Sequence, residues 1–309
     1  MNLALVFPGQ GSQSKNMLSD FIGDPDFREI ISQASKILSY DIEKIVEDEE
    51  KINNTIYTQP IMLATSYAMW VLMKKYLDLK ICIGAGHSLG EYSALVANDS
   101  ISFIDGLSIV KKRAELMSNV MRGIDGSMAA IIGLSGNEVD KICKQLSNQD
   151  SIIEAVNFNC PGQTVIAGHS KAIDDGAQKL KDAGAKIVKK LPVSLAAHTS
   201  LLRPVADELK DELNKININL TTSFDVIHNY DLSVSENVEC RVNALAMQVC
   251  SPVRWIETLE LFNKKNVTDI IEVGSGNVLS GLVKRFDKSI NMHSINNIED
   301  INILKQTLS

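Results

Sequence analysis

The sequence lacks cysteine pairs, long apolar runs and an excess of basic residues. Its five cysteines are widely spaced and form no C-x-x-C pair, so neither a disulfide framework nor a structural zinc site is expected. Free thiols are typical of a reducing cytoplasm, where we expect the protein to be. No stretch approaches the roughly 18–20 consecutive apolar residues of a membrane span. The first apolar run ends at Pro8 without a basic flank, which predicts a strand and not a signal peptide.

The charge balance disfavours partners that need a basic surface. The 309 residues include 31 Lys and Arg against 38 Asp and Glu, a formal net charge of −7. Nucleic acids and anionic membranes are therefore not expected as partners. With 45% hydrophobic and 22% charged residues, the composition is globular and excludes a disordered or fibrous chain. The length fits one large domain or two smaller ones, and we expect a monomer.

Hydrophobic periodicity predicts an α/β chain. Short apolar runs that end in turn-forming residues predict strands at 3–7, 81–85, 225–228 and 268–273. Helical spacing and capping residues predict helices that begin near residues 24, 58, 91 and 102, the last of them running to about 121. Three later helices are predicted over 200–216, after Ser251-Pro252 through 262, and after 274–277.

A different pattern begins after Gly123 and Gly126. Strands are predicted at 128–132, 152–158, 163–167 and 186–191, and helices at 138–146 and 171–183. This β-α-β-β-α-β order is that of the ferredoxin-like unit, for which roughly 70 residues suffice. We therefore expect a ferredoxin-like small domain over 124–195, inserted into a large domain made of 1–123 and 196–309.

The strongest chemical signal is Gly86-x-Ser88-x-Gly90, which lies between a predicted strand and a predicted helix. A G-x-S-x-G elbow exposes a serine hydroxyl on a sharp turn, and its glycines are needed because the chain passes close to itself. The amide of Leu89 and the helix N-terminus then point toward a developing oxyanion. The alternative is an ordinary glycine turn with an idle serine, which the flanking strand and helix disfavour.

A nucleophilic serine needs a base, and the chain offers five histidines. His87 adjoins the serine and is expected to point away from it. His169 lies in the inserted unit, and His228 and His293 lie near strand ends. His198 lies in a loop where the chain re-enters the large domain, a common place for catalytic residues. Spacing alone favours His198 without excluding the others.

Several motifs together resemble one family. In chain order they are Phe7-Pro8-Gly9-Gln10-Gly11-Ser12-Gln13, Thr58-Gln59-Pro60, Gly86-His87-Ser88-Leu89-Gly90-Glu91-Tyr92-Ser93-Ala94-Leu95, Asn157-Phe158-Asn159, Pro161-Gly162-Gln163-x-Val165-Ile166-Ala167-Gly168 and Glu272-Val273-Gly274-x-Gly276. In order and spacing they resemble the malonyl-CoA:acyl carrier protein transacylases, within the acyltransferase family of fatty acid and polyketide synthesis. The resemblance implies a large α/β-hydrolase-like domain with a ferredoxin-like insertion.

The resemblance also implies roles for particular residues. Ser88 would be the nucleophile and His198 the base, with the imidazole held by the backbone carbonyl of Gln248 instead of by an Asp. The amides of Gln10 and Leu89 would form the oxyanion hole. The implied reaction transfers a malonyl group from malonyl-CoA to the phosphopantetheine thiol of acyl carrier protein, through a malonyl ester on Ser88 and without a cofactor or metal.

Arg113 matches the arginine that pairs with the malonyl carboxylate in this family, and Gln59 and Gln248 are expected beside the substrate. A planar guanidinium can hold a carboxylate bidentately, and if left unpaired in a closed pocket it penalises acetyl. Without the resemblance, Arg113 beside Lys111 and Lys112 would be interpreted as a solvated helix charge.

Carrier proteins are usually acidic, so docking would need local positive charge on this acidic chain. The candidates, each explained as well by solvation, are Lys186, Lys189, Lys190, Lys284 and Arg285. Ala197 is small, which leaves room for a branched acyl group. Three other interpretations stay open: a serine esterase or thioesterase with the same elbow, a transferase for another acyl group, and an inactive relative that only docks to a carrier protein.

Overall fold

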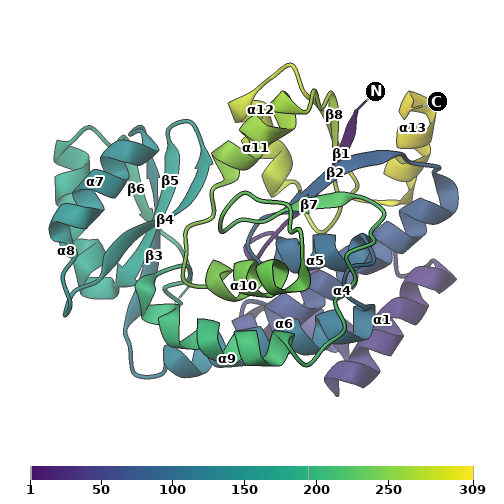
Figure 1. Ribbon diagram of the computed structural model, residues 1–309, viewed down its shortest axis with the longest axis horizontal. Coiled ribbons are helices and arrows are strands. Elements are labelled where there is room, and N and C mark those ends of the chain that lie inside the picture. The colour runs from purple at the N-terminus through teal and green to yellow at the C-terminus, as the bar shows by residue number, and fades with distance from the viewer. Residues whose placement is uncertain (1, 194, 309) are drawn as a thin grey trace.

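The chain folds around two β-sheets that lie beside each other (Figure 1). The computed structural model describes residues 2–193 and 195–308. One sheet has five parallel strands in the order β7-β2-β1-β8-β9. The other has four antiparallel strands in the order β4-β5-β3-β6. The predicted α/β class is therefore confirmed, with a parallel and an antiparallel part.

The parallel sheet forms the centre of the larger part. Its strands are β1 (Leu3–Phe7), β2 (Ile81–Gly86), β7 (Asp225–Ile227), β8 (Asp269–Glu272) and β9 (Asn291–Ser294). Every residue of β1 is buried, and successive side chains point to opposite faces. Leu5 and Phe7 pack into one hydrophobic cluster, and Ala4 and Val6 into another. A parallel strand covered on both faces explains why this segment is uniformly apolar.

Helices cover both faces of this sheet. They are α1 (Pro25–Leu38), α2 (Ile42–Glu47), α3 (Glu49–Ile52), α4 (Thr55–Tyr76), α5 (Gly90–Ala97), α6 (Phe103–Val120), α9 (Arg203–Leu213), α10 (Val238–Gln248), α11 (Trp255–Lys264), α12 (Val278–Phe286) and α13 (Ile298–Leu308). Residues of α4, α5 and α6 share the cluster of Leu5 and Phe7. Residues of α11 and α12 share the cluster of Ala4 and Val6, so they lie on the opposite face.

Several predicted helix starts are confirmed and two helices are corrected. Asp24 caps α1 by accepting the Asp26 and Phe27 amides at 2.9 and 3.2 Å, and Ser102 caps α6. Helix α4 begins at Thr55 and not near Pro60, because Asn54 caps it. The helix predicted over 200–216 is a 3₁₀ turn at Ser200–Leu202 followed by α9, which ends at Leu213. Helices α2, α3, α10 and α13 and strand β9 were not predicted.

The antiparallel part has the predicted β-α-β-β-α-β order. Its elements are β3 (Gly126–Ile132), α7 (Gly136–Leu146), β4 (Ile153–Cys160), β5 (Gln163–His169), α8 (Ser170–Asp182) and β6 (Ile187–Lys190). Ile131, Val139 and Leu180 belong to a hydrophobic cluster of this part alone. The other face of the sheet joins the main core through Met128 and Val165. The small sheet is therefore anchored on the larger part.

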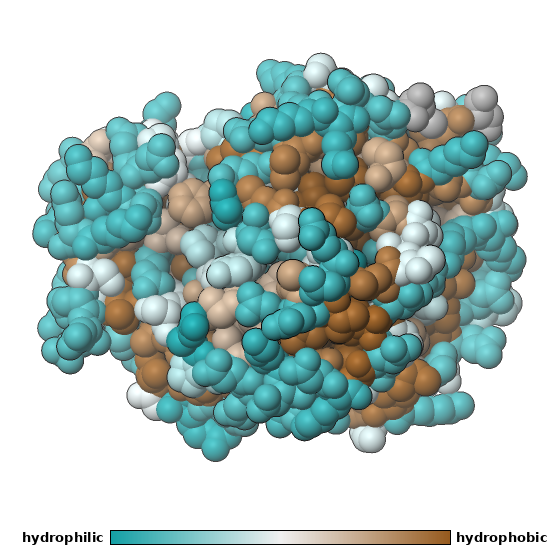
Figure 2. All heavy atoms as spheres, in the orientation of Figure 1, coloured by the Kyte–Doolittle hydropathy of each residue, from teal (hydrophilic) through white to brown (hydrophobic). Residues whose placement is uncertain are grey.

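The outward faces of α7 and α8 are polar. In Figure 2 hydrophilic side chains cover these two helices, at the left of the view. Each helix buries a narrow stripe, which includes Val139 and Cys143 in α7 and Ile173 and Leu180 in α8. Over residues 2–193 and 195–308, none of the helices has the length and apolarity to cross a membrane.

Candidate active site

Ser88 lies on a tight turn between β2 and α5. Its φ is +52°, in the left-handed region that a serine rarely adopts. A Cβ on Gly86 would lie 1.9 Å from the carbonyl carbon of Gly90, and a Cβ on Gly90 would lie 1.9 Å from the carbonyl oxygen of Phe7. Only glycine fits at either position, so the predicted G-x-S-x-G elbow is present with the geometry that its sequence requires.

His198 is the histidine that contacts Ser88. Its Nε2 lies 2.7 Å from Ser88 Oγ, and its Nδ1 lies 2.9 Å from the carbonyl oxygen of Gln248. A carbonyl can only accept, so Nδ1 carries the proton and donates it. The Nε2 lone pair is then free to accept the serine proton. Burial, and next the positive charge of Arg113, lower the pKa of His198 to about 3, so the imidazole is neutral near pH 7.

The other four histidines have partners elsewhere. His87 Nε2 lies 2.9 Å from Asn159 Oδ1, and burial lowers the pKa of His87. His169 Nδ1 accepts the Ile152 amide. His228 lies against Glu91 and His293 against Asp269, at 2.7 and 3.0 Å. Of the five candidates, therefore, His198 is the one whose ring is placed against the Ser88 hydroxyl.

Arg113 projects from α6 into the same place. It is 1% exposed, so the alternative of a solvated helix charge is wrong. Its guanidinium donates to Gln59 Oε1, to Gln248 Oε1 at 2.9 Å and to Ser88 Oγ at 3.3 Å. Among the described residues none of its hydrogen-bond partners is a carboxylate. Burial lowers the pKa of Arg113, and the negative charge of Glu91 offsets this only in part, so a guanidinium that also faces the Ser88 hydroxyl suits an anionic ligand.

Gln10 and Leu89 line the cavity that holds Ser88, His198 and Arg113, with a volume of about 340 Å³. Neither backbone amide donates to a protein acceptor within 2–193 and 195–308. The Gln10 side chain is held by Thr55 Oγ1, whose hydroxyl donates to Gln10 Oε1 at 2.9 Å. Both amides are thus available to an oxyanion at the cavity.

The small sheet closes the other side of this cavity. Met128 of β3, Asn157 of β4 and Leu191 line it, and the register of β4 shifts around Asn157, as at a β-bulge. A second cavity of about 760 Å³ shares Gln10 and Leu195 with the first and continues away from it between α3 and α6. Asn53, Pro192 and Val193 also line both, so the two cavities adjoin.

Gln248, which the resemblance implied, terminates a helix that the sequence did not predict. Its side-chain Nε2 donates to the Ser88 carbonyl at 2.9 Å and to Glu91 Oε2 at 2.7 Å. Glu91 and Asn229 were not predicted as site residues. Two signals could have found them: Glu91 is the one charged residue in a fully buried helix, and Asn229 follows strand β7 at the carboxyl edge of the sheet, where sites of α/β folds form.

Metal ligands do not gather here. Over the described part of the chain, no group of three or more His, Cys, Asp or Glu side chains is placed to hold a metal ion. The candidate docking cations lie outside the cavity and are exposed. Lys190 is paired with Asp174 at 2.7 Å, and Arg285 donates to Gln163.

Comparison with known proteins gives the family. Residues 4–298 match the family described as the acyl transferase domain, so the chain belongs to the acyl transferase family. It is 41% identical to the malonyl CoA-acyl carrier protein transacylase of Haemophilus influenzae over 99% of this chain and 98% of that protein. It is 40% identical to the protein of the same name in Staphylococcus aureus over 96% of each. Within the family it groups with the malonyl CoA-acyl carrier protein transacylases.

Solved structures of similar proteins have the same fold. The malonyl CoA-acyl carrier protein transacylase of Coxiella burnetii has a TM-score of 0.96 at 35% identity and covers 100% of this chain and 98% of that one. A malonyl-transacylase solved in complex with a type II PKS acyl-carrier protein has a TM-score of 0.96 at 37% identity, over 99% of this chain and 100% of that one. The whole fold is therefore shared.

Proposed function

We propose that this chain transfers the malonyl group of malonyl-CoA to the phosphopantetheine thiol of acyl carrier protein, as a step of fatty acid biosynthesis. The observation that carries the proposal is the buried Arg113 guanidinium, which has no carboxylate partner among the described residues and lies 3.3 Å from Ser88 Oγ. A serine paired with a histidine is a nucleophile for acyl transfer. The arginine beside it selects an acyl group that ends in a carboxylate.

The first half-reaction forms an ester on Ser88. His198 Nε2 takes the proton of Ser88 Oγ as the oxygen attacks the thioester carbonyl of malonyl-CoA. The amides of Gln10 and Leu89 donate to the oxyanion, and each such donor is worth roughly 3 kcal/mol in this chemistry. As the tetrahedral intermediate collapses, the C–S bond breaks and His198 returns the proton to the CoA thiolate. Malonyl-serine remains.

The second half-reaction uses the same groups in reverse. The phosphopantetheine thiol gives its proton to His198 Nε2 and attacks the ester carbonyl, and the C–O bond to Ser88 breaks as the proton returns to Oγ. Histidine carries the proton in both directions, so the mechanism calls for no metal or cofactor. The Gln248 carbonyl is sufficient in place of an Asp, because it fixes the tautomer of His198 through Nδ1.

Selection of malonyl over acetyl follows from Arg113. Bound acetyl would leave the buried guanidinium without a carboxylate to pair with directly, and a site of this kind rejects the analogue by up to about 10⁴-fold. Gln59 and Gln248 hold the guanidinium from two sides, which orients its plane before substrate arrives.

The sheet topologies support a finer description of the fold. We propose a large α/β-hydrolase-like domain over 1–123 and 196–309, and a ferredoxin-like small domain over 124–195. The parallel sheet with an elbow at the end of β2 supports the first, and the order β4-β5-β3-β6 supports the second. We also propose that the protein works as a cytoplasmic monomer and that its partner is acyl carrier protein, as in the complex of the similar malonyl-transacylase.

The test is intact-protein mass spectrometry after mixing with malonyl-CoA or acetyl-CoA. The wild type is expected to gain one malonyl group, and much less acetyl. Ser88→Ala should gain none, whereas replacement of Ser93, a buried serine within α5, by alanine should leave acylation intact. Free CoA without an adduct would indicate a hydrolase instead. Absence of both adduct and CoA release would favour another acyl donor or a protein that only docks.

A further inference from the structure

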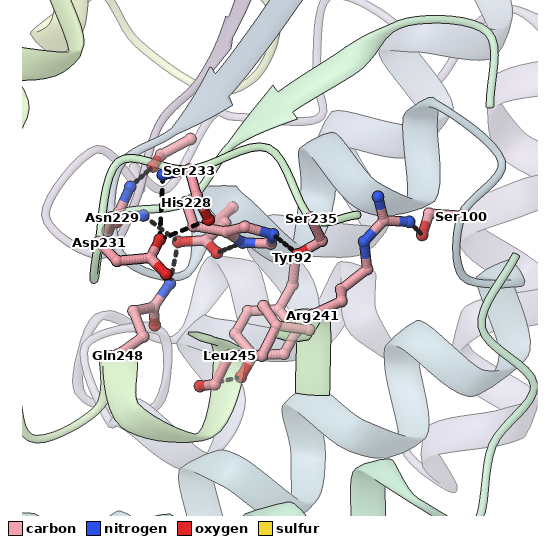
Figure 3. A network of polar contacts seen from close by, with 12 residues as sticks. Tyr92, Ser100, His228, Asn229, Asp231, Ser233, Ser235, Arg241, Leu245 and Gln248 are labelled. Atoms are coloured by element: carbon pink, nitrogen blue, oxygen red, sulfur yellow. Dashed lines mark hydrogen bonds and ion pairs between the residues drawn. The ribbon is translucent and has the colours of Figure 1, made fainter. Parts of the chain in front are cut away.

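A single buried carboxylate lies behind the catalytic residues. Glu91 is the second residue of α5 and is 0% exposed. Three donors surround it: His228 Nδ1 at 2.7 Å, the Asn229 amide at 3.0 Å and Gln248 Nε2 at 2.7 Å. In Figure 3 Gln248, from the end of α10, lies beside His228 and Asn229, which follow each other directly after β7. The two half-reactions proposed above leave this carboxylate without a role.

Asn229 connects Glu91 to the elbow. Its backbone amide donates to Glu91 Oε2, while its side chain accepts the Ser88 amide at 2.8 Å and donates to the Gly86 carbonyl at 2.7 Å. These two side-chain bonds span the turn that holds Ser88 at a positive φ. Because they clamp the strained turn from outside the chain segment that forms it, the position of Glu91 bears on the direction of the Ser88 hydroxyl.

Gln248 connects Glu91 to the other two groups. Its Nε2 faces two acceptors, Glu91 Oε2 and the Ser88 carbonyl, so the amide nitrogen is fixed on that side. Its Oε1 must then face Arg113, from which it accepts at 2.9 Å. A reversed amide would place an NH₂ group against a guanidinium, with two donors facing each other. The Glu91 carboxylate, together with the Ser88 carbonyl, therefore determines which end of Gln248 meets Arg113.

Gln248 also supplies the backbone carbonyl that accepts from His198 Nδ1. Glu91 is in turn held by His228, whose Nε2 lies 2.6 Å from Ser235 Oγ. The chain of contacts runs from Ser235 through His228 and Glu91 to Gln248, and from there to both the base and the guanidinium. Networks of this kind can contribute more than the sum of their separate contacts.

We propose that Glu91, oriented by His228, is a positioning residue. It fixes the orientation of Gln248 and of the Ser88 turn, and so keeps the nucleophile, the base and the guanidinium in their relative positions. The inference rests on the proposed roles of Ser88, His198 and Arg113. Glu91 touches none of the reacting atoms. Its influence should therefore be visible in acyl selectivity, which depends on how Arg113 is held.

The test is Glu91→Gln, with the rate of Ser88 adduct formation measured separately for malonyl-CoA and acetyl-CoA. Misplacement of reacting groups by about 1 Å can lower a rate roughly 10²-fold. We expect malonyl transfer to fall by about that factor, and the malonyl-to-acetyl ratio to fall at least about tenfold, because a neutral amide is a weaker acceptor than the carboxylate for Gln248 Nε2 and holds the side chain that orients Arg113 less firmly.

Glu272→Gln is the matched control. Glu272 is also a fully buried carboxylate at the end of a parallel strand, and it accepts the amides of Leu279 and Ser280 and the hydroxyl of Ser280. It contacts none of the site residues, so its loss should lower the melting temperature and leave the ratio unchanged. A role of Glu91 in stability alone would give the same pattern as this control, and would overturn the proposal.

A double-mutant cycle tests whether Glu91 acts on selectivity through Gln248. If Glu91 acts on selectivity through the Gln248 side chain, Glu91→Gln should not change the ratio further in a Gln248→Ala background. An equal change in both backgrounds would overturn that route. If Glu91→Gln does not fold, His228→Ala removes one of the three donors and should lower the ratio severalfold; an unchanged ratio would overturn the proposal. Wild-type protein that forms no malonyl adduct would instead overturn the proposed function.

Discussion

The two sheets contribute to the cavity in different ways. The larger part supplies every group with a proposed chemical role, and most of these side chains make two or more hydrogen bonds within it. Arg113 and Gln248 are examples, because each contacts three or more other groups. The antiparallel part supplies a wall. Met128 and Leu191 are apolar, and the buried Oδ1 of Asn157 has no partner among the described residues.

The parallel side therefore provides oriented charges and dipoles, and the antiparallel side provides the shape of the cavity. Stabilising an oxyanion and a carboxylate needs dipoles that are oriented before the substrate binds, and buried hydrogen bonds provide that orientation. A wall that excludes water needs only bulk. Changes on the parallel side should therefore alter rate and acyl selectivity, whereas changes on the antiparallel side should alter substrate affinity or stability.

The largest effect is expected from Arg113→Ala. Removal of the guanidinium should lower the ratio of malonyl to acetyl adduct formation by up to about 10⁴-fold, because the buried cation proposed to pair with the malonyl carboxylate is lost. Lys112→Ala changes the neighbouring, partly exposed position of the same helix and should leave the ratio unchanged. If Arg113→Ala kept the wild-type ratio, the cavity would not recognise a carboxylate through this residue.

The next effect is expected from Gly86→Ala. The added Cβ would lie 1.9 Å from the Gly90 carbonyl carbon, so the elbow must shift, and a shift near 1 Å lowers the rate by about 10²-fold. The measurement is the malonylation rate together with the melting temperature.

Gly281→Ala serves as its control. Gly281 is in helix α12 with nothing within 4 Å of an added Cβ, so alanine there should stabilise by about 0.5–1 kcal/mol and leave the rate alone. Wild-type rates in Gly86→Ala would mean that the turn tolerates a side chain.

A third effect concerns pH. A base acts when it is deprotonated, and the pKa of His198 is lowered to about 3, first by burial and then by Arg113. Adduct formation should therefore stay nearly constant from pH 8 to pH 5. An imidazole with its ordinary pKa near 6.5 would lose about 30-fold over that range.

Arg113→Ala sharpens this prediction when acetyl-CoA is the donor for both proteins. Loss of the positive charge raises the pKa of His198, so the decline at acid pH should begin at a higher pH than in the wild type. An acid limb near pH 6.5 in the wild type would contradict the buried, neutral imidazole.

The features that could be predicted from the sequence are those that depend on residues close together in the chain. The elbow was predicted because strand, glycines and helix follow one another within a few residues. The ferredoxin-like order was predicted because each of its elements has a clear period and a turn at its end. Asp24 and Ser102 marked helix starts for the same reason. A local steric or capping requirement leaves a short pattern that can be interpreted without the rest of the chain.

The contacts that complete the site are distant in sequence. His198 meets Ser88 from 110 residues away, and only the family resemblance selected it from five histidines. Arg113 would have been interpreted as a solvated charge, because its neighbours Lys111 and Lys112 are cationic. Glu91 and Asn229 meet across 138 residues, and no spacing rule connects them. Helix α10, which ends at Gln248, was missed because it has no clear apolar stripe.

The smallest effect is expected on the antiparallel side, from Asn157→Ala. Asn157 lies at the shift in the register of β4, and its Oδ1 has no partner among the described residues. It can therefore make one hydrogen bond to a bound substrate, worth about 1 kcal/mol. The KM for malonyl-CoA should rise roughly fivefold, while the malonyl-to-acetyl ratio stays unchanged. Ile131→Val, in the small part's own core, should lower stability by about 0.5–1.5 kcal/mol without altering KM. A change of selectivity in Asn157→Ala would show that the small sheet does more than enclose the substrate, because the carboxylate would then be recognised from both sides.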